Sequence, residues 1–418
     1  MRPAPPRGRL LAAGLALLVL ATVVTTARAQ VGDVGRSLTL PDRPGPHAFW
    51  LSDIVLHRTA LFDADVGELR GTISSGTAGV GFVVFPLFAP DGREIYLPET
   101  YYERGVRGKR TDVVTVYDAR TLEPVHEIGI PPKRAEYFPG NAANALSDDG
   151  RFLAIFNLTP VASLSIVDVV ARRFTSDVPT PGCSLVFAAG PRRFFMLCAN
   201  GAALTVVLDD GGQPISISRG QPFFDPANDP LTEKAVRRGS TWLFVSFAGD
   251  VQPIEVGGDT LVVGERWPLF DEADRKAAWR VGGAQHLAVH AASGRLYVLV
   301  HQGGPDTHKQ PGSEVWVYDL ASRRRVQRIE TLSPLVSFIA QQGSLGTDRM
   351  LGRLGRWMLG VSLPHTGVDD ILVTQDDHPV LIAAGAMPPT VTVHDAMTGA
   401  VQREISEVGL GISLLFAP

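Results

Sequence analysis

Two hydrophobic patterns alternate along the chain, and together they predict an all-β fold. In the first, a strand ends in an Asp-containing turn and a second strand follows, as in V-T-V-Y-D-A-R-T-L-E-P-V at 114–125. In the second, a turn with Asp-Gly or Ser-Gly introduces a strand, as in A-P-D-G-R-E-I-Y at 89–96. Apolar residues at every second position, bounded by Asp and Gly, are typical of short antiparallel strands joined by tight turns.

The strand–turn–strand pattern recurs, which indicates a repeat architecture. Its seven copies lie at 58–73, 114–125, 164–174, 204–215, 251–263, 315–326 and 391–402. The average spacing of about 55 residues suits four short strands and their loops, the size of a propeller blade. The sequence therefore predicts a seven-bladed β-propeller of four-stranded antiparallel blades. We expect the last strand, at 412–416, to complete a blade with N-terminal strands and so to close the ring.

Residues 1–29 have the order of a secretory signal peptide. Basic residues precede an apolar run at 10–24, and the small-x-small sequence Ala27-Arg28-Ala29 follows. We predict cleavage before Gln30, so that residues 30–418 form one propeller domain without a membrane span. The alternative is a membrane anchor, for which the apolar run is short.

Charge then bears on the kind of partner. Loss of residues 1–29 removes four arginines and no acidic residue, which changes the formal net charge from −4 to −8. This balance argues against a nucleic-acid partner and suits protein or small-molecule partners.

The cysteines and histidines offer no obvious metal site. Cys183 and Cys198 flank an expected hairpin, and in an oxidising compartment they predict one disulfide, which contributes about 3 kcal/mol. Two buried free thiols are the alternative. His286 and His290 would face one side of a strand about 13 Å apart, too far for a common metal. The chain also lacks a nucleophile elbow, an HExxH motif, a phosphate-binding Gly loop and a dinucleotide fingerprint.

One arm, at 101–110, does not recur in the other repeats. It holds a cluster of aromatic and basic residues, namely Tyr101, Tyr102, Arg104, Arg107 and Arg110. Tyr and Arg are enriched at protein interfaces, so these five residues are candidates for partner contacts. A structural loop and a charge-steering site are the alternatives.

The connection between the sixth and seventh repeats is long. Their turn residues, Asp319 and Asp395, are 76 residues apart, and the excess falls near 341–369. An elongated hairpin or loop explains it, and a contact surface for a partner is the second interpretation.

Several motifs in the same order resemble one known family. These are E-T-Y-Y-E-R-G-V-R-G-K-R-T-D-V-V-T-V-Y-D at 99–118, E-I-G-I-P-P-K-R at 127–134 and P-D-T-H-K-Q-P-G-S-E-V-W-V-Y-D at 305–319. They resemble the heavy subunit of the quinoprotein amine dehydrogenases, the methylamine and aromatic amine dehydrogenases of the bacterial periplasm. The resemblance extends from about residue 50 to the C-terminus and places the family's disulfide at Cys183 and Cys198.

The resemblance implies an oxidoreductase assembled from two heavy and two light subunits in the periplasm. In such an enzyme a primary amine is oxidatively deaminated to an aldehyde and ammonia, and electrons pass to a blue copper protein such as amicyanin or azurin. The cofactor, tryptophan tryptophylquinone, and the catalytic Asp belong to the light subunit. This chain is therefore expected to hold no cofactor and no catalytic residue, and to support the light subunit and line the substrate channel.

The resemblance also assigns one channel residue, Phe82. An ordinary core phenylalanine is the alternative, and Phe85 and Phe88 are close competitors. The rival function is a stand-alone propeller that binds a ligand or partner, or that hydrolyses lactones. A lactonase would need acidic and Asn residues around a central metal, a set that the sequence does not reveal.

Overall fold

A computed structural model describes residues 39–74, 86–135, 141–331, 367–386 and 389–417. The chain divides into two units, Met1–Thr39 and Leu40–Pro418, and in the first of these Thr39 is described. The expected signal peptide and its cleavage site therefore lie outside the described residues. Within the described ranges, no helix is long and apolar enough to cross a membrane.

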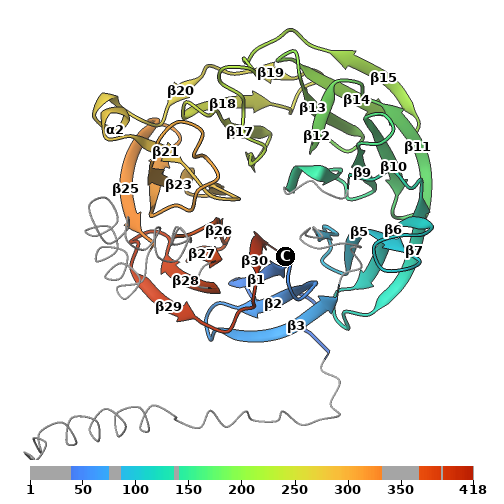
Figure 1. The fold of residues 1–418 in the computed structure, drawn as a ribbon, viewed down its shortest axis with the longest axis horizontal. Helices are drawn as coiled ribbons and strands as arrows, with labels where there is room; N and C mark the ends of the chain where they lie inside the picture. Colours follow the sequence, from blue (N-terminus) through green and yellow to red (C-terminus); the bar gives the residue numbers. More distant parts are fainter. Residues whose placement is uncertain (1–38, 75–85, 136–140, 332–366, 387–388, 418) are drawn as a thin grey trace, which may run out of the picture. The chain divides into compact units, whose positions relative to one another are not determined.

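The second unit is a ring of seven antiparallel sheets, or blades, that follow one another in sequence order around an axis (Figure 1). We name the strands of each blade A to D from the axis outward. Blades 1 to 3 contain, in this order, β30 (Ile412–Phe416), β1 (Ala48–Asp53), β2 (Arg58–Asp63) and β3 (Glu68–Ser74); β4 (Leu87–Phe88), β5 (Glu94–Tyr102), β6 (Arg110–Asp118) and β7 (Pro124–Ile130); β8 (Asn144–Leu146), β9 (Phe152–Asn157), β10 (Ser163–Asp168) and β11 (Arg173–Pro179).

The remaining blades have the same order. Blades 4 to 7 contain β12 (Cys183–Ala188), β13 (Arg193–Cys198), β14 (Ala203–Leu208) and β15 (Pro214–Arg219); β16 (Val236–Arg238), β17 (Thr241–Val245), β18 (Asp250–Glu255) and β19 (Val262–Val263); β22 (Leu287–His290), β23 (Arg295–Gln302), β24 (Glu314–Asp319) and β25 (Arg324–Glu330); β26 (Asp370–Val373), β27 (Val380–Ala386), β28 (Pro389–Asp395) and β29 (Val401–Ile405). This confirms the predicted seven-bladed propeller.

Short extra elements decorate the ring. Blades 5 and 6 each have a fifth strand. In blade 5, β20 (Trp267–Pro268) pairs with β18, and in blade 6, β21 (Trp279–Val281) pairs with β23. The helical elements of the described residues are the 3-10 turn η1 (Asn141–Ala143) and α2 (Glu272–Lys276).

Each of the seven repeated patterns forms the C–D hairpin of one blade. An Asp recurs in these turns because its carboxylate accepts hydrogen bonds from backbone N–H groups that have no backbone acceptor there. Asp118 Oδ1, for example, accepts hydrogen bonds from the backbone N–H groups of Arg120 and Thr121, both at 2.9 Å. The second pattern, with its Gly, forms A–B turns such as that between β4 and β5.

The ring closes as expected through a blade made from both ends of the unit. Strand β30 pairs with β1, with Trp50 opposite Phe416 and Leu51 opposite Leu415. In Figure 1 the red strand β30 lies beside the blue strand β1.

The hydrophobic core is divided among the contacts between neighbouring blades. Seven clusters of buried side chains were found in the described residues, and each joins two adjacent blades. The middle strands consequently have two buried faces. Residues 113–117 of β6, for example, are all buried, because blade 1 covers one face of the sheet and blade 3 the other.

The predicted disulfide is confirmed. Cys183 and Cys198 are cross-strand neighbours at the ends of β12 and β13, and their sulfur atoms are bonded. Both residues are buried in the cluster between blades 3 and 4, and the bond ties the two inner strands of blade 4 together there.

Candidate functional site: the loop face and the axial cavity

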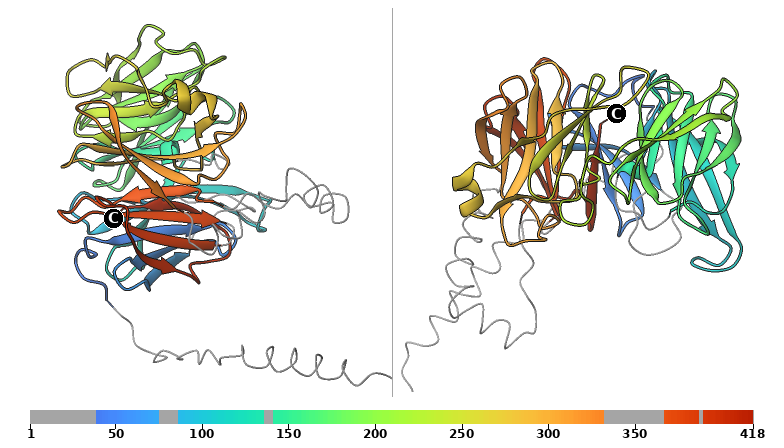
Figure 2. Two further views of the ribbon diagram at one scale, coloured as in Figure 1. Left: turned by 90° about the vertical axis from the view of Figure 1, so that its left-hand side faces the viewer. Right: turned by 90° about the horizontal axis from the view of Figure 1, so that it is seen from above.

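The two faces of the ring differ in the length of their connections. Because strands alternate in direction, A–B and C–D connections lie on one face and B–C and D–A connections on the other. The former are short turns such as 119–123 and 147–151, whereas the latter include 103–109, 220–235 and 303–313. We call these the turn face and the loop face. Figure 1 looks onto the loop face, and the right-hand view of Figure 2 shows the hairpin of β5 and β6 projecting from it.

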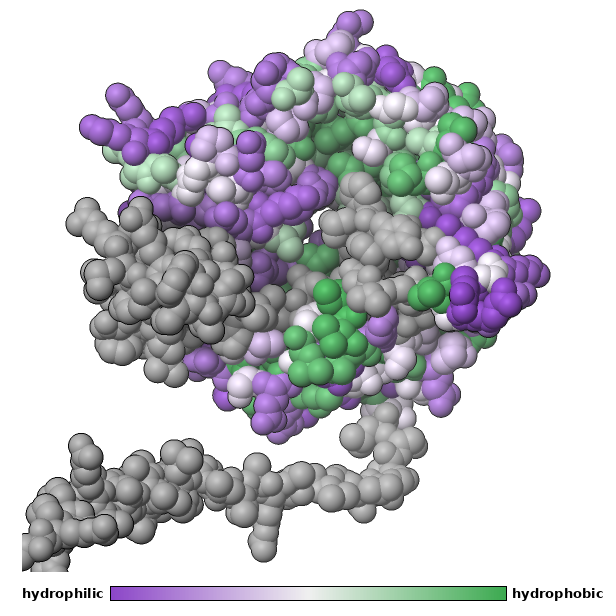
Figure 3. Space-filling view, in the orientation of Figure 1, coloured by the Kyte–Doolittle hydropathy of each residue, from purple (hydrophilic) through white to green (hydrophobic). Residues whose placement is uncertain are grey.

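Exposed apolar side chains gather on the loop face over blade 1 (Figure 3). Val55 and Leu56 lie in the B–C connection and are 55% and 41% exposed, and Leu410, before β30, is 64% exposed. We call these three residues the blade 1 patch. The two loops touch, since a Cβ added to Gly411 would lie 2.5 Å from Val55 Cγ2.

A single buried carboxylate holds the blade 1 patch in place. Asp53 Oδ1 accepts hydrogen bonds from the N–H groups of Val55, Leu56 and Gly411 at 2.9, 3.0 and 3.2 Å. Its Oδ2 accepts one from the N–H of Leu410 at 2.8 Å. The apolar side chains are therefore presented by fixed loops, as suits a surface that receives a partner.

The arm at 101–110 is more regular than the sequence suggested. Tyr101, Tyr102 and Arg110 belong to β5 and β6, and the connection itself is 103–109. Arg104 and Arg107 are exposed there, and Figure 3 shows hydrophilic surface over this hairpin. Tyr101 donates a hydrogen bond to Glu99 Oε2 at 3.1 Å, and burial together with this carboxylate raises the pKa of Tyr101.

Arg110, in contrast, points inward. Its Nε and Nη2 atoms lie 2.8 and 2.7 Å from the two oxygens of the buried Asp112, and Nη2 also donates to the Arg134 carbonyl oxygen at 2.7 Å. Asp112 accepts further hydrogen bonds from Thr100 Oγ1 and the Arg134 N–H, both at 3.0 Å. Arg110 thus stabilises the base of the hairpin, and of the five candidate residues Arg104 and Arg107 are the arginines that present charge at the surface.

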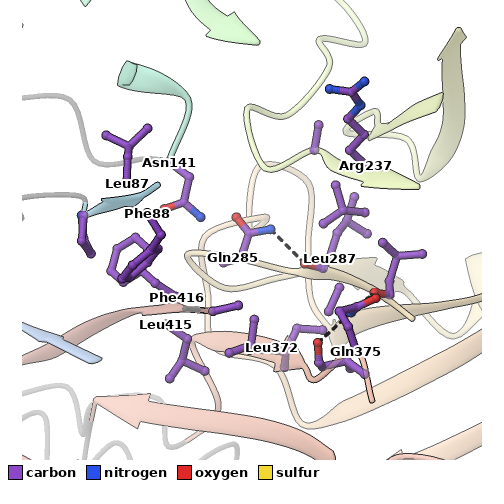
Figure 4. A pocket seen from close by; sticks show the side chains of 18 of the residues that line it. Leu87, Phe88, Asn141, Arg237, Gln285, Leu287, Leu372, Gln375, Leu415 and Phe416 are labelled. Atoms are coloured by element: carbon purple, nitrogen blue, oxygen red, sulfur yellow. Dashed lines mark hydrogen bonds between the residues drawn. The ribbon is translucent and has the colours of Figure 1, made fainter. Parts of the chain in front are cut away.

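A cavity of about 650 Å3 lies on the axis of the ring (Figure 4). The innermost strands of blades 1, 2, 3, 5, 6 and 7 line it. Most of its wall is apolar; representative residues are Leu87, Phe88, Leu146, Leu287, Leu372 and Phe416. Such a volume is in the range of small-molecule sites.

Polar groups of the cavity wall are held in defined positions. Gln285 is buried, and its Nε2 donates to the carbonyl oxygens of Leu287 at 2.9 Å and Lys234 at 3.2 Å. Arg237 forms a two-pronged ion pair with Asp148, with N–O distances of 2.6 and 2.9 Å. This pair joins the inner strand of blade 5 to the A–B turn of blade 3.

A group of titratable residues lies near the cavity. Glu233 pairs with Lys234, and although burial opposes its ionisation, the Lys234 ammonium lowers the pKa of Glu233. His286 is fully buried, with Nε2 2.9 Å from Thr232 Oγ1. Burial and the nearby Lys234 charge lower the pKa of His286 to about 3, so His286 is neutral at physiological pH.

Asp370 ties blade 7 to blade 1. Its Oδ2 accepts a hydrogen bond from the N–H of Leu415 at 2.9 Å, and burial raises the pKa of Asp370 well above its usual value. Among the described residues, no group of three or more His, Cys, Asp or Glu side chains has the arrangement of a metal site. His286 and His290 serve separate contacts, since His290 Nε2 lies 3.1 Å from the Asp376 carbonyl oxygen.

Phe82 and Phe85 lie outside the described residues. Phe88 lines the axial cavity, where its ring centroid is 6.0 Å from that of Trp50. Of the long connection at 341–369, residues 367–369 are described; Gly312 and Val368 form a β-bridge there.

Sequence reasoning missed the cavity residues, including Asn141, Gln285 and Arg237. They come from inner strands of two to five residues, or from the segments just before them, and no motif relates them. The one available signal was the D–A connection 220–235, which is long enough to reach the axis.

Comparisons with known proteins agree with the fold and name a family. The sequence pattern of the methylamine dehydrogenase heavy chain (MADH) family matches residues 55–342. The methylamine dehydrogenase heavy chain of Methylobacillus flagellatus is 26% identical over 92% of this chain and 90% of its own length, and that of Paracoccus versutus is 26% identical over 85% and 74%.

Solved structures show the same architecture. A protein of unknown function from Desulfotomaculum acetoxidans has a TM-score of 0.55 at 12% identity and covers 88% of this chain and 98% of its own. The dihydro-haem d1 dehydrogenase NirN has a TM-score of 0.53 at 16% identity, and the match covers 90% of this chain and 77% of the NirN chain. The similarity to these solved structures shows a shared fold. The sequence matches show the family: the chain belongs to the methylamine dehydrogenase heavy chain family.

Proposed function

We propose that this chain is the heavy subunit of a periplasmic amine dehydrogenase, which oxidatively deaminates a primary amine to an aldehyde and ammonia. Two heavy and two light subunits form the enzyme, and a blue copper protein such as amicyanin or azurin accepts the electrons. The match of residues 55–342 to the heavy chain family carries this proposal.

The loop face supports the scaffolding role. It carries the long connections, the hairpin with Arg104 and Arg107, and the blade 1 patch held by Asp53. Exposed apolar side chains on fixed loops and exposed arginines on the same face have the composition of a protein interface. We assign this face to the light subunit, and Phe82 to the wall of the amine channel.

The quinone belongs, in this proposal, to the light subunit, where it would take up the two electrons of the amine. Among the described tryptophans, Trp279 and Trp316 have the rings nearest to each other, with centroids 4.9 Å apart. This pair does not fit the role of a quinone that oxidises an amine. Trp316 is fully buried, with the Arg325 guanidinium carbon 4.0 Å from its ring centre, so an amine has no access to it. This chain contributes binding surfaces and a path for the amine.

Purification of the tagged chain from the periplasm, followed by intact mass and a visible spectrum, tests the proposal. We expect a small disulfide-rich companion whose quinone absorbance bleaches when a primary amine is added. A colourless chain that elutes alone, together with a genome that lacks a neighbouring cysteine-rich reading frame, would instead indicate a stand-alone propeller.

A further inference from the structure

The axial cavity has a wall that fits an apolar body. Side chains from separate blades converge on it, among them Leu87, Leu287, Leu372 and Phe416 (Figure 4). The cavity of about 650 Å3 is larger than a single aromatic ring or branched alkyl chain needs, so either can enter without displacing the wall.

One hydrogen-bond acceptor is fixed inside this apolar wall. Gln285 directs both hydrogens of its Nε2 to backbone carbonyl oxygens, those of Lys234 and Leu287. The orientation of the carboxamide is thereby set, and in Figure 4 its carbonyl oxygen is directed across the cavity toward Asn141. A ligand that donates a hydrogen bond can meet this oxygen, while one that only accepts cannot and is left with the exposed side chain of Asn141.

The charges around the cavity cancel in pairs. Arg237, the charged residue among those that line it, is bound at both nitrogens to Asp148. Lys234, whose carbonyl oxygen holds Gln285, is paired with Glu233. A charged ligand would lose its hydration without gaining an opposite charge, which disfavours both ammonium and carboxylate groups.

We infer that the axial cavity binds a neutral small molecule with an aromatic or branched aliphatic body and one hydrogen-bond-donating group, which Gln285 accepts. This site goes beyond the proposed amine oxidation and does not depend on it, because it is formed by the inner strands of this chain alone. A buried acceptor that selects for a donor gives such a site its specificity.

Four probes of nearly equal size test the inference. Benzyl alcohol is neutral and donates a hydrogen bond, anisole is its isomer without a donor, and benzylammonium and benzoate carry opposite charges. Each is titrated into the full chain as purified, after dithionite has reduced any quinone of the partner, so that benzylammonium is not oxidised during the titration. We expect benzyl alcohol to bind with a dissociation constant on the order of 1 mM, and the other three at least fivefold more weakly.

A matched pair of variants locates the binding. Leu372→Trp fills the cavity, whereas Leu69→Trp places the same side chain on the exposed outer strand β3. Benzyl alcohol binding should be lost in the first and unchanged in the second, and methyl NMR signals of Leu87 and Leu287 should shift on binding to the unmodified chain. The inference is overturned by equal binding of anisole, by tighter binding of either ion, by methyl signals that do not move, or by binding that Leu372→Trp retains.

Discussion

His47 and Asp376 join the first blade to the last. The Nε2 atom of His47 lies 3.2 Å from Asp376 Oδ2 and 3.1 Å from the His378 carbonyl oxygen, and its Nδ1 lies 2.6 Å from Asp65 Oδ1. Acceptors face both ring nitrogens, which suits the imidazolium form with two donors. Burial opposes this charge, but the hydrogen bonds and charges of Asp65 and Asp376 outweigh it and raise the pKa of His47.

This contact predicts a pH-dependent stability. A raised pKa means that the stabilisation is fully present below the unfolded-state pKa of about 6.5 and is lost as the pH rises through the folded-state pKa. His47→Gln should lower the free energy of unfolding by roughly 1 kcal/mol at pH 6, and by less at pH 9. Urea unfolding at the two pH values measures this, with the exposed His126→Gln as control. A loss of equal size at both pH values would show that the charge of His47 is not involved.

Asp53→Asn should loosen the blade 1 patch. The substitution places an amide N–H₂ against N–H groups that now share a carboxylate, and unsatisfied donors are costly when buried. We expect the free energy of unfolding to fall by roughly 2–3 kcal/mol and amide exchange at Leu410 and Gly411 to accelerate. Asp91→Asn is the control. Asp91 lies in an exposed turn and accepts one backbone N–H, so this substitution should lower the free energy of unfolding by less than about 1 kcal/mol. Unchanged exchange at Leu410 would contradict the role of Asp53.

Leu410→Glu should weaken the binding of the light subunit without unfolding the ring. The side chain is 64% exposed, so a charge is tolerated in the free chain but is desolvated in an interface. We expect at least a tenfold loss of affinity, with the melting temperature unchanged. Ile215→Glu is the matched control, because Ile215 is 66% exposed on the outer strand of blade 4. Equal effects of the two substitutions would move the docking site away from the blade 1 patch.

Phe82→Ala should change the preference among amines while the quinone content of the complex stays the same. A channel residue acts on the fit of the amine side chain, so kcat/KM should change by different factors across a series of primary amines of increasing size. Phe88→Ala serves as the comparison, because Phe88 packs with Trp50 at the axial cavity. Identical kinetics of Phe82→Ala and the unmodified enzyme for every amine would remove Phe82 from the channel.

The blades were predictable because the turns that define them are local. Asp118, Asp319 and Asp395 accept hydrogen bonds from backbone N–H groups two or three residues further along the chain. A few adjacent residues therefore determine each turn. The disulfide was predictable for a similar reason, since one short hairpin brings Cys183 and Cys198 together.

The axial cavity was not predictable, because its residues meet only after the ring has closed. Gln285 and Leu415 are separated by most of the last two blades, and no sequence motif relates the two positions. The inward role of Arg110 was missed because the sequence does not show that Asp112 is buried, and because its second partner, the Arg134 carbonyl oxygen, lies beyond the next strand of the blade. The strands buried on both faces also follow from blade stacking, which a single strand does not reveal.

The pairing of β30 with β1 sets the order in which this chain can fold. β1 is the first of the blade strands along the chain and β30 the last, so the edge of β1 stays unpaired until the C-terminal strand is available. Neighbouring blades can begin to pack as soon as both exist, since each core cluster needs only two of them. The contacts of blade 7 with blade 1, including that of His47, form last, and until then the nascent protein is an open arc.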